Sequence, residues 1–364
     1  MLIINIGIMK TIIFSALFLL SIVTNAQTKN VLLEEYTGVH CGSCPMGSYY
    51  VDSMITKYPN LVAVALHSYS SFDAMFFLEI DTLFNIFSTG APEGAVDRIN
   101  PGGSSTNVAQ YITAWDANIQ TQLTTPALLT LTVLPLWNFV TRNISTQIDI
   151  NIIANLPIGD YRINLYVVED SVTGIGFGYD QDNYYNTVVG NPFYGLGDPI
   201  VGFVHRHVAR ALLPETFGQS GIIPSSPTSG QNFTTTINYT LPVSYNENRI
   251  KLIAFVSKFT SNHQGDIILN AAETPLLLFS GISNESTEYA STVFPNPSCG
   301  QFTFNGLKKE NTIEVYDITG RLVYQLVAEK ETQTINLSNK EKGIYFYSVT
   351  SSKSEVSQGK LILQ

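Results

Sequence analysis

The chain has 364 residues, a net charge of −10 and charged side chains at only 13% of its positions. This length predicts two or three domains, and 45% hydrophobic residues with a mean hydropathy of +0.12 suffice for their cores. The negative charge and the lack of a basic stripe exclude nucleic acid as an expected partner, because its phosphate backbone would be repelled.

Residues 1–26 are predicted to form a cleaved signal peptide. Lys10 supplies a positive charge, an apolar stretch follows at 11–23, and small residues precede a cut ahead of Gln27. A membrane anchor is the alternative, but the apolar stretch is short for a span of about 20 residues and no basic stop follows it. Export would place the mature protein where thiols tend to be oxidised.

Strand and helix patterns alternate after the signal peptide. Short apolar runs predict strands at 31–36, 60–66 and 93–99, and apolar positions at three-to-four spacing predict helices at 49–58, 81–87 and 105–123. This alternation is typical of an α/β sandwich, which we expect over residues 27–124.

The helical pattern is missing from the middle of the chain. Alternating Val, Ile, Thr and Tyr residues, bounded by Pro, Gly and Asn, predict strands at 127–135, 145–153, 161–170, 231–241 and 249–258. An all-β sandwich over residues 125–280 is the expected architecture.

A polar linker and a small all-β domain are expected at the end of the chain. Residues 281–291 are polar and predict the linker, and residues 292–364 predict a small β-sandwich. Its first hairpin is expected to turn at Asp317 and Gly320.

The motif Cys41-Gly42-Ser43-Cys44 follows a predicted strand and opens a helix. A helix N-terminus stabilises a thiolate, so the position suits Cys41 for disulfide exchange. Glu35 lies on the strand beneath and could exchange a proton with Cys44. Cys41 and Cys44 are expected to pair as a disulfide, which leaves Cys299 over.

The order of strand, acidic residue, Cys-x-x-Cys-Pro and helix resembles the thioredoxin family. The resemblance implies that Cys41 is the nucleophile, Cys44 the resolving thiol and Glu35 the buried acid. Thioredoxins also hold a cis-proline against the cysteines, and the stretch STGAP before the strand at 93–99 implies that Pro92 is this residue.

The sequence departs from the thioredoxin pattern in three ways. His40 and Ser43 stand where the family usually has Trp and Pro. A histidine beside the nucleophile could stabilise its thiolate and make the pair more oxidising. One predicted strand, where the family usually has two, separates Pro92 from the last predicted helix.

Three alternatives to disulfide exchange stay open for the cysteine pair. It could be a permanently closed disulfide, although such a small loop gives little entropic stabilisation. A zinc site would need about four ligands, and His40, Cys41 and Cys44 supply three, so no metal and no cofactor are expected. In the third alternative the fold is kept for binding and the redox chemistry is lost.

Two further resemblances concern the place where the protein works. The stretches 32–45, 88–98, 203–218 and 251–271 together resemble the outer-membrane-protein-28-like family of Gram-negative surface proteins. That family implies a thioredoxin-like domain followed by a β-domain, exported toward the cell surface, and its members are described as surface proteins rather than as enzymes of settled activity.

The last residues resemble the type A C-terminal sorting domain of the type IX secretion system. The match covers residues 293–363 and consists of several spaced blocks, from which Cys299 departs. It implies the type IX secretion machinery as a partner, removal of the domain, and frequent attachment to lipopolysaccharide at the outer-membrane surface.

Two hypotheses follow for a protein that is secreted or held at the outer-membrane cell surface. In the first it is a thiol–disulfide oxidoreductase acting on extracytoplasmic proteins, with Cys41, Cys44, Glu35 and Pro92 as catalytic residues. In the second it is a non-enzymatic adhesin or binding protein in which the Cys41–Cys44 disulfide is structural.

Overall fold

The computed structural model describes residues 29–68, 70–102, 107–138, 141–263, 266–276, 292–317, 321–350 and 356–364. The predicted signal peptide, the linker and Gly320 lie outside the described residues.

The N-terminal part of the chain alternates strands and helices, as predicted. Its elements are β1 (Val31–Thr37), α1 (Cys44–Lys57), β2 (Leu61–His67), α2 (Leu78–Phe87), β3 (Glu93–Val96), β4 (Gln110–Tyr111) and α3 (Trp115–Leu123). Pro45 lies in the first turn of α1, where its missing N–H leaves no hydrogen bond unmade.

The predicted helix at 105–123 is wrong in its first part. Gln110 and Tyr111 instead form β4, which pairs with Gly94 and Glu93 of β3, and α3 begins only at Trp115. The indole N–H of Trp115 donates to the carbonyl of Gln110 at 2.8 Å, which stabilises the turn between β4 and α3. β4 is therefore a second strand between Pro92 and the last helix of this part, where the sequence pattern predicted only one.

The middle of the chain is rich in β-strands. It contains β5 (Leu129–Asn138), β6 (Asn143–Ile152), β7 (Asp160–Glu169), β8 (Val208–Leu213), β9 (Asn232–Thr240), β10 (Ile250–Phe259) and β11 (Ile267–Pro275). The sequence pattern did not predict β8 and β11.

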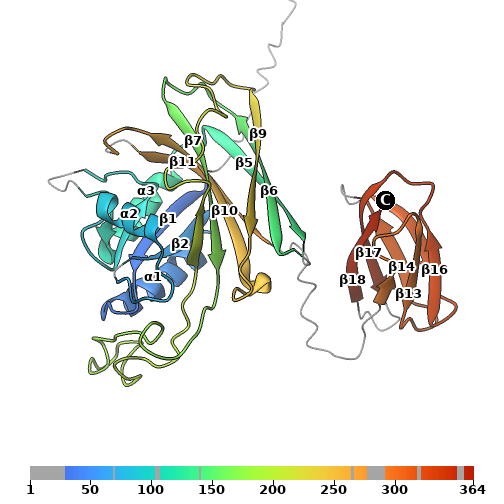
Figure 1. Ribbon diagram of the computed structural model, residues 1–364, viewed down its shortest axis with the longest axis horizontal. Helices are drawn as coiled ribbons and strands as arrows, with labels where there is room; N and C mark the ends of the chain where they lie inside the picture. The colour runs from blue at the N-terminus through green and yellow to red at the C-terminus, as the bar shows by residue number, and fades with distance from the viewer. Residues whose placement is uncertain are drawn as a thin grey trace, which may run out of the picture.

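One eight-stranded sheet runs through both of these parts in the order β11-β10-β7-β8-β2-β1-β3-β4 (Figure 1). β1 and β2 are parallel, and β2 meets β8 where Ala65 pairs with Val208. The boundary expected at 124/125 stays a prediction, and the structure adds that strands from its two sides pair directly.

The helices cover both faces of this sheet. α1 and α3 pack through Val51, Met54, Trp115 and Ile119 against the face that carries Leu33. α2 packs through buried apolar residues against the opposite face, which carries Leu32, Tyr36, Tyr166 and Phe255. Neighbouring residues of β1 therefore serve different cores, because successive side chains of a strand point to opposite faces.

A second layer of strands completes the middle part. β5, β6 and β9 form a three-stranded sheet, and their inward Leu, Ile and Val residues share a core with β7 and β10. This arrangement fits the expected β-rich architecture.

The C-terminal part is a separate all-β unit. It contains β12 (Thr292–Phe294), β13 (Gln301–Asn305), β14 (Thr312–Tyr316), β15 (Leu322–Val327), β16 (Thr332–Asn336), β17 (Gly343–Thr350) and β18 (Val356–Leu363). A sheet of three strands and a sheet of four enclose a core that includes Phe302, Phe304 and Ile313. The predicted hairpin is confirmed as β14 and β15.

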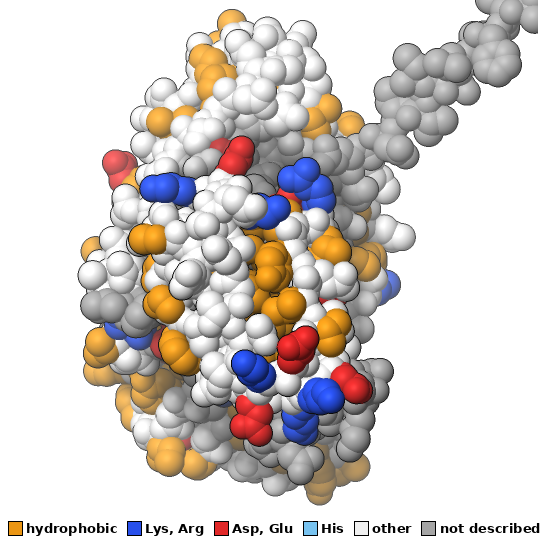
Figure 2. Space-filling view, turned by 90° about the vertical axis from the view of Figure 1, so that its right-hand side faces the viewer, with side chains coloured by type: hydrophobic (Ala, Val, Ile, Leu, Met, Phe, Trp, Pro, Cys, Tyr) orange, Lys and Arg blue, Asp and Glu red, His pale blue; other side chains and the backbone are white. Residues whose placement is uncertain are grey.

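One face of the molecule carries few charged side chains. Figure 2 shows one face, on which Lys, Arg, Asp and Glu side chains are scattered over a largely uncharged surface. Among the described residues, no helix is long and apolar enough to cross a membrane.

Candidate functional site

The cysteine pair lies where β1 gives way to α1. Cys41 and Cys44 form the predicted disulfide, with their Cα atoms 5.3 Å apart, and α1 begins at Cys44. Cys299 is exposed and carries a free thiol. Within the described ranges, no group of three or more His, Cys, Asp and Glu side chains is placed to hold a metal ion.

Glu35 and Pro92 meet beneath the start of α1. A Cβ atom built on Gly47 would stand 2.3 Å from Oε1 of Glu35 and 2.8 Å from Cβ of Pro92, so only glycine fits at this position of the helix. The Ala91–Pro92 bond is cis, as the thioredoxin resemblance implies. The structure therefore brings both predicted residues to the helix that carries Cys44.

The carboxyl group of Glu35 is buried without a partner. Its residue is 2% exposed, and Oε1 accepts no hydrogen bond in the structure. Burial, with a smaller contribution from the negative charge of Asp52, raises the pKa of Glu35 to about 8. The group can therefore hold or release a proton near neutral pH.

Glu35 and Cys44 face a common cavity. This cavity has a volume of about 10 Å³, which is enough for roughly one water molecule. His67, Gln181 and His205 also line it. A single water there could carry a proton between the carboxyl group and the Cys44 sulfur once the disulfide opens.

Both cysteines are covered by another part of the chain. Cys41 is 4% exposed and Cys44 is 1% exposed. The cover is part of the 38-residue connection between β7 and β8, residues 170–207, which runs beside α1 (Figure 1). The sequence pattern gave no sign of this arrangement.

Gln181 joins the connection to the cysteine loop. Its side-chain Nε2 is buried and shares its protons among the carbonyl oxygens of Gly38, Val39 and Cys41, at 3.0 to 3.2 Å. The bonds reach across about 140 positions of sequence, so local pattern cannot reveal them.

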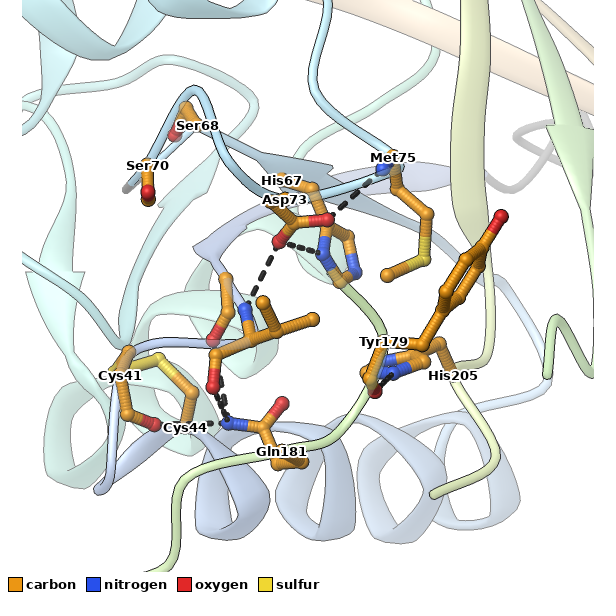
Figure 3. A network of polar contacts seen from close by, with 12 residues as sticks. Cys41, Cys44, His67, Ser68, Ser70, Asp73, Met75, Tyr179, Gln181 and His205 are labelled. Atoms are coloured by element: carbon orange, nitrogen blue, oxygen red, sulfur yellow. Dashed lines mark hydrogen bonds and ion pairs between the residues drawn. A yellow bond between two sulfur atoms is a disulfide. The ribbon is translucent and has the colours of Figure 1, made fainter. Parts of the chain in front are cut away.

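A buried polar network supports the loop from its other side (Figure 3). Asp73 accepts the backbone N–H groups of Val39 and Met75 at 2.9 Å and lies 2.7 Å from Nδ1 of His67. Burial alone would raise the pKa of Asp73, but the charge and hydrogen bond of His67 and the two backbone N–H groups outweigh it and lower the pKa.

His205 extends the network to the connection. Its Nε2 lies 2.8 Å from the carbonyl oxygen of Tyr179, and its ring meets that of His67 edge-on at 5.2 Å. Burial and the neighbouring His67 lower the pKa of His205 to about 4. The ring is therefore neutral at physiological pH and donates to Tyr179.

Acidification is expected to destabilise the protein through His205. Its pKa is about 4 when folded and 6.5 ordinarily, so the unfolded chain binds the extra proton between these values. Stability from this group is present above pH 6.5 and is lost as the pH falls to 4, by at most about 3 kcal/mol. Chemical denaturation across this range should show a flatter profile for His205→Gln than for the unchanged protein.

The control for that experiment is Asn248→Ala, at an exposed polar residue that does not titrate. It should keep the slope of the unchanged protein between pH 4 and 6.5. Equal slopes in His205→Gln and the unchanged protein would contradict the assignment to His205.

The predicted and observed sites differ mainly in what surrounds the cysteines. The structure gathers Cys41, Cys44, Glu35 and Pro92, all named from sequence. His67, Asp73 and Gln181 were missed. His205, which is 3% exposed, was missed as well.

Comparison with known proteins gives two family matches. The model described as outer membrane protein Omp28 matches residues 81–271, just over half of the chain. The model described as a secretion system C-terminal sorting domain matches residues 292–364. Both resemblances found in the sequence are thereby confirmed, and the cysteine motif lies before the first matched range.

Solved structures support the fold. The chain is similar to HBP35 of Porphyromonas gingivalis, with a TM-score of 0.54 and 19% identity, covering 93% of this chain and 99% of that one. A protein from Agrobacterium tumefaciens has a TM-score of 0.43 at 12% identity, covering 69% and 96%.

A domain of the outer membrane lipoprotein Omp28 from Porphyromonas gingivalis has a TM-score of 0.23 at 11% identity, covering 41% of this chain and 88% of that one. The TM-scores of the Agrobacterium tumefaciens protein and of this Omp28 domain are too low to support a conclusion about the fold. No curated protein sequence matches the chain.

Proposed function

This chain belongs to the Omp28 family of outer membrane proteins, and we propose that it exchanges thiols and disulfides with other proteins outside the cytoplasm. Its family and its type IX sorting domain identify it as a secreted, cell-surface or outer-membrane protein. The proposal includes a thioredoxin-like domain at 27–124 and a β-sandwich domain at 125–280. It also includes delivery by the type IX machinery with attachment to the outer-membrane surface.

One observation carries the proposal: an unpartnered carboxyl group lies next to a disulfide. Glu35 faces the same cavity as Cys44, and its pKa is about 8. A buried group of this kind reduces stability when it ionises, and a structural disulfide has no use for it. Perturbed acids beside reactive groups are typical of catalytic sites.

The roles follow from the chemistry of exchange. In the reduced protein, the Cys41 thiolate attacks a disulfide of the partner, forming a mixed disulfide and releasing one partner thiolate. In its ionised form, Glu35 takes the proton of Cys44, whose sulfur then attacks the Cys41 sulfur. The Cys41–Cys44 disulfide forms again, the second partner sulfur leaves as a thiolate, and Glu35 or solvent supplies its proton. Pro92 shapes the surface beside the cysteines.

Replacing Cys41 with serine is expected to abolish exchange. The hydroxyl of serine cannot form a mixed disulfide, so turnover of a protein disulfide with a dithiol reductant should fall to the uncatalysed rate. Cys299→Ser is the matched control, because Cys299 is an exposed free thiol outside the site. Turnover that survives in Cys41→Ser, or that is absent from the unchanged reduced protein, would contradict the proposal.

A second function is favoured by the burial of both sulfurs. A surface binding protein with a structural disulfide would keep Cys41 and Cys44 covered, as they are here. The connection that covers them also exposes large apolar side chains, among them Ile175, Phe177 and Val189 at 70% or more. Such side chains are suited to contact with another molecule. If the protein turned over no disulfide substrate and the Cys41–Cys44 disulfide had a very low reduction potential, surface binding would be the remaining function.

A further inference from the structure

We infer that residues 181–184, here called the strap, hold the exchange site closed by occupying the side from which a partner would reach Cys41. The inference rests on the proposed function and concerns its regulation. In this state the site is a closed form, and exchange requires the strap to leave.

The strap runs along the cysteine loop and is hydrogen-bonded to several of its backbone carbonyls. The backbone N–H of Asp182 donates to the carbonyl of Val39 at 2.8 Å, and the N–H of Tyr184 donates to that of Gly42 at 2.8 Å. Gln181 supplies the side-chain donor to Cys41 between them. The strap thus provides every one of these donors, and the loop provides the acceptors.

The ring of Tyr184 lies on the cysteine loop at Gly42. A Cβ atom built on Gly42 would stand 2.2 Å from Cδ1 of Tyr184, so the ring rests directly on the glycine. The other side of the ring faces solvent, since Tyr184 is 71% exposed. Lifting the ring would therefore remove little buried surface, whereas it would uncover the backbone beside Cys41.

The strap is also hydrogen-bonded to the rest of the connection. The backbone N–H of Asn183 donates a hydrogen bond to Asp198 at 2.8 Å. The side chain of Asn183 donates to the carbonyl oxygens of Phe193 and Gly197. The backbones of Gln181 and Ile200 also pair. These bonds lie within the connection, so they can stay in place when the strap separates from the loop.

Disulfide exchange cannot proceed past this cover. The attacking sulfur must approach a disulfide sulfur along the S–S axis, so access limits the rate. With Cys41 4% exposed, a protein partner has no room beside it until the strap moves. A partner that presents an extended segment with free backbone N–H groups could replace the strap at the carbonyls of Val39 and Gly42. Extended, incompletely folded polypeptides are therefore the expected substrate class.

Two substitutions test the strap while keeping the four proposed catalytic side chains. Tyr184→Ala removes the covering ring, and Gly42→Ala pushes it away, because the added methyl group would overlap it. Each should raise the rate at which thioredoxin reduces the Cys41–Cys44 disulfide by about tenfold or more, with a smaller rise for a phosphine reductant. The double variant should be no faster than Tyr184→Ala, because the overlap is then gone.

The control is Tyr194→Ala, a half-exposed tyrosine of the same connection. Unchanged rates in both test variants, or an equal rise in Tyr194→Ala, would overturn the inference. Faster reduction of the disulfide without any turnover of protein substrates would instead support the strap and reject the proposed exchange function.

A measurement on the unchanged protein covers the case in which the variants fail to fold. Hydrogen exchange at the backbone N–H groups of Asp182 and Tyr184 reports how often the strap opens. The protection factor of these two amides should equal the ratio of two reduction rates: that of a short, oxidised Cys-Gly-Ser-Cys peptide divided by that of the protein disulfide. Unprotected amides in a protein whose disulfide resists reduction would show that something other than the strap covers it.

Discussion

Replacing Glu35 with glutamine is expected to stabilise the protein at alkaline pH and to flatten the dependence of its unfolding free energy on pH. The pKa of Glu35 is about 8 in the folded protein and 4.5 ordinarily. Between these values the folded state holds a proton that the unfolded chain has released, so stability falls as the pH rises from 4.5 to 8. A shift of this size corresponds to at most about 5 kcal/mol.

The measurement is urea denaturation of the oxidised protein at several pH values between 4 and 9. Glutamine fills the same space without ionising, so its unfolding free energy should not decline over the window in which that of the unchanged protein does. Glu79→Gln, on α2 at the opposite face of the sheet, is the matched control and should keep the decline. Parallel profiles for Glu35→Gln and the unchanged protein would show that Glu35 ionises normally.

The same substitution separates stability from function. If Glu35 takes the proton of Cys44, Glu35→Gln should slow exchange while leaving the protein more stable. A mutation that stabilises a protein and weakens its activity is the expected result when a strained group is kept for catalysis. If the Cys41–Cys44 disulfide is only structural, Glu35→Gln should raise stability and there should be no exchange activity for it to change.

The sequence could reveal the cysteine site because its signals are local. Cys41 and Cys44 are three positions apart, and Glu35 lies on the strand that leads to them. Pro92 required a family resemblance, since nothing in its own neighbourhood says which residues it faces. These four residues could be predicted without knowledge of the chain beyond position 99.

The strap could not be predicted in this way. Gln181 and Tyr184 bond to backbone carbonyls, which every residue carries, so no complementary side chain marks their targets. The connection has no helical or strand period, and its polar and aromatic residues are those of an ordinary loop. A contact of this kind is fixed by the pairing of β2 with β8, which brings residues 170–207 to the site.

The missed strands have a similar physical reason. β4 has two residues, too few for any alternation to be visible, and pairing with β3 overrides the helical spacing around it. β8 has apolar residues on both faces because it lies inside the eight-stranded sheet. Sequence patterns therefore gave most elements of this fold but not the continuity of its sheet.

The neighbouring residue Glu34 has the opposite role to Glu35, although both are buried on β1. Glu34 points to the α2 face, where Arg98 donates to its two oxygens at 2.7 and 2.6 Å and the hydroxyl of Tyr166 donates at 2.6 Å. Burial alone would lower the pKa of Arg98, but the Glu34 carboxylate outweighs it and raises that pKa. Both oxygens of Glu34 are thus hydrogen-bonded, and one of their donors is the Arg98 cation.

Replacing Arg98 with methionine is therefore expected to destabilise the protein severely. The guanidinium is 1% exposed and also lies over the rings of Phe87 and Phe255, at 5.0 and 5.4 Å. Methionine could fill much of this space, but the carboxylate of Glu34 would remain buried without its cation. We expect a loss of about 3 to 5 kcal/mol in unfolding free energy, measured by urea denaturation at pH 7.

A double variant distinguishes the lost charge from the lost packing. Glu34→Leu combined with Arg98→Met removes both charges and should recover a large part of the stability, because an apolar pair avoids the cost of an unpaired carboxylate. Lys57→Met is the control: it breaks the exposed ion pair with Asp116, whose atoms are 2.6 Å apart, and should change stability little. No recovery in the double variant would mean that packing of the guanidinium, rather than its charge, stabilises this face of the sheet.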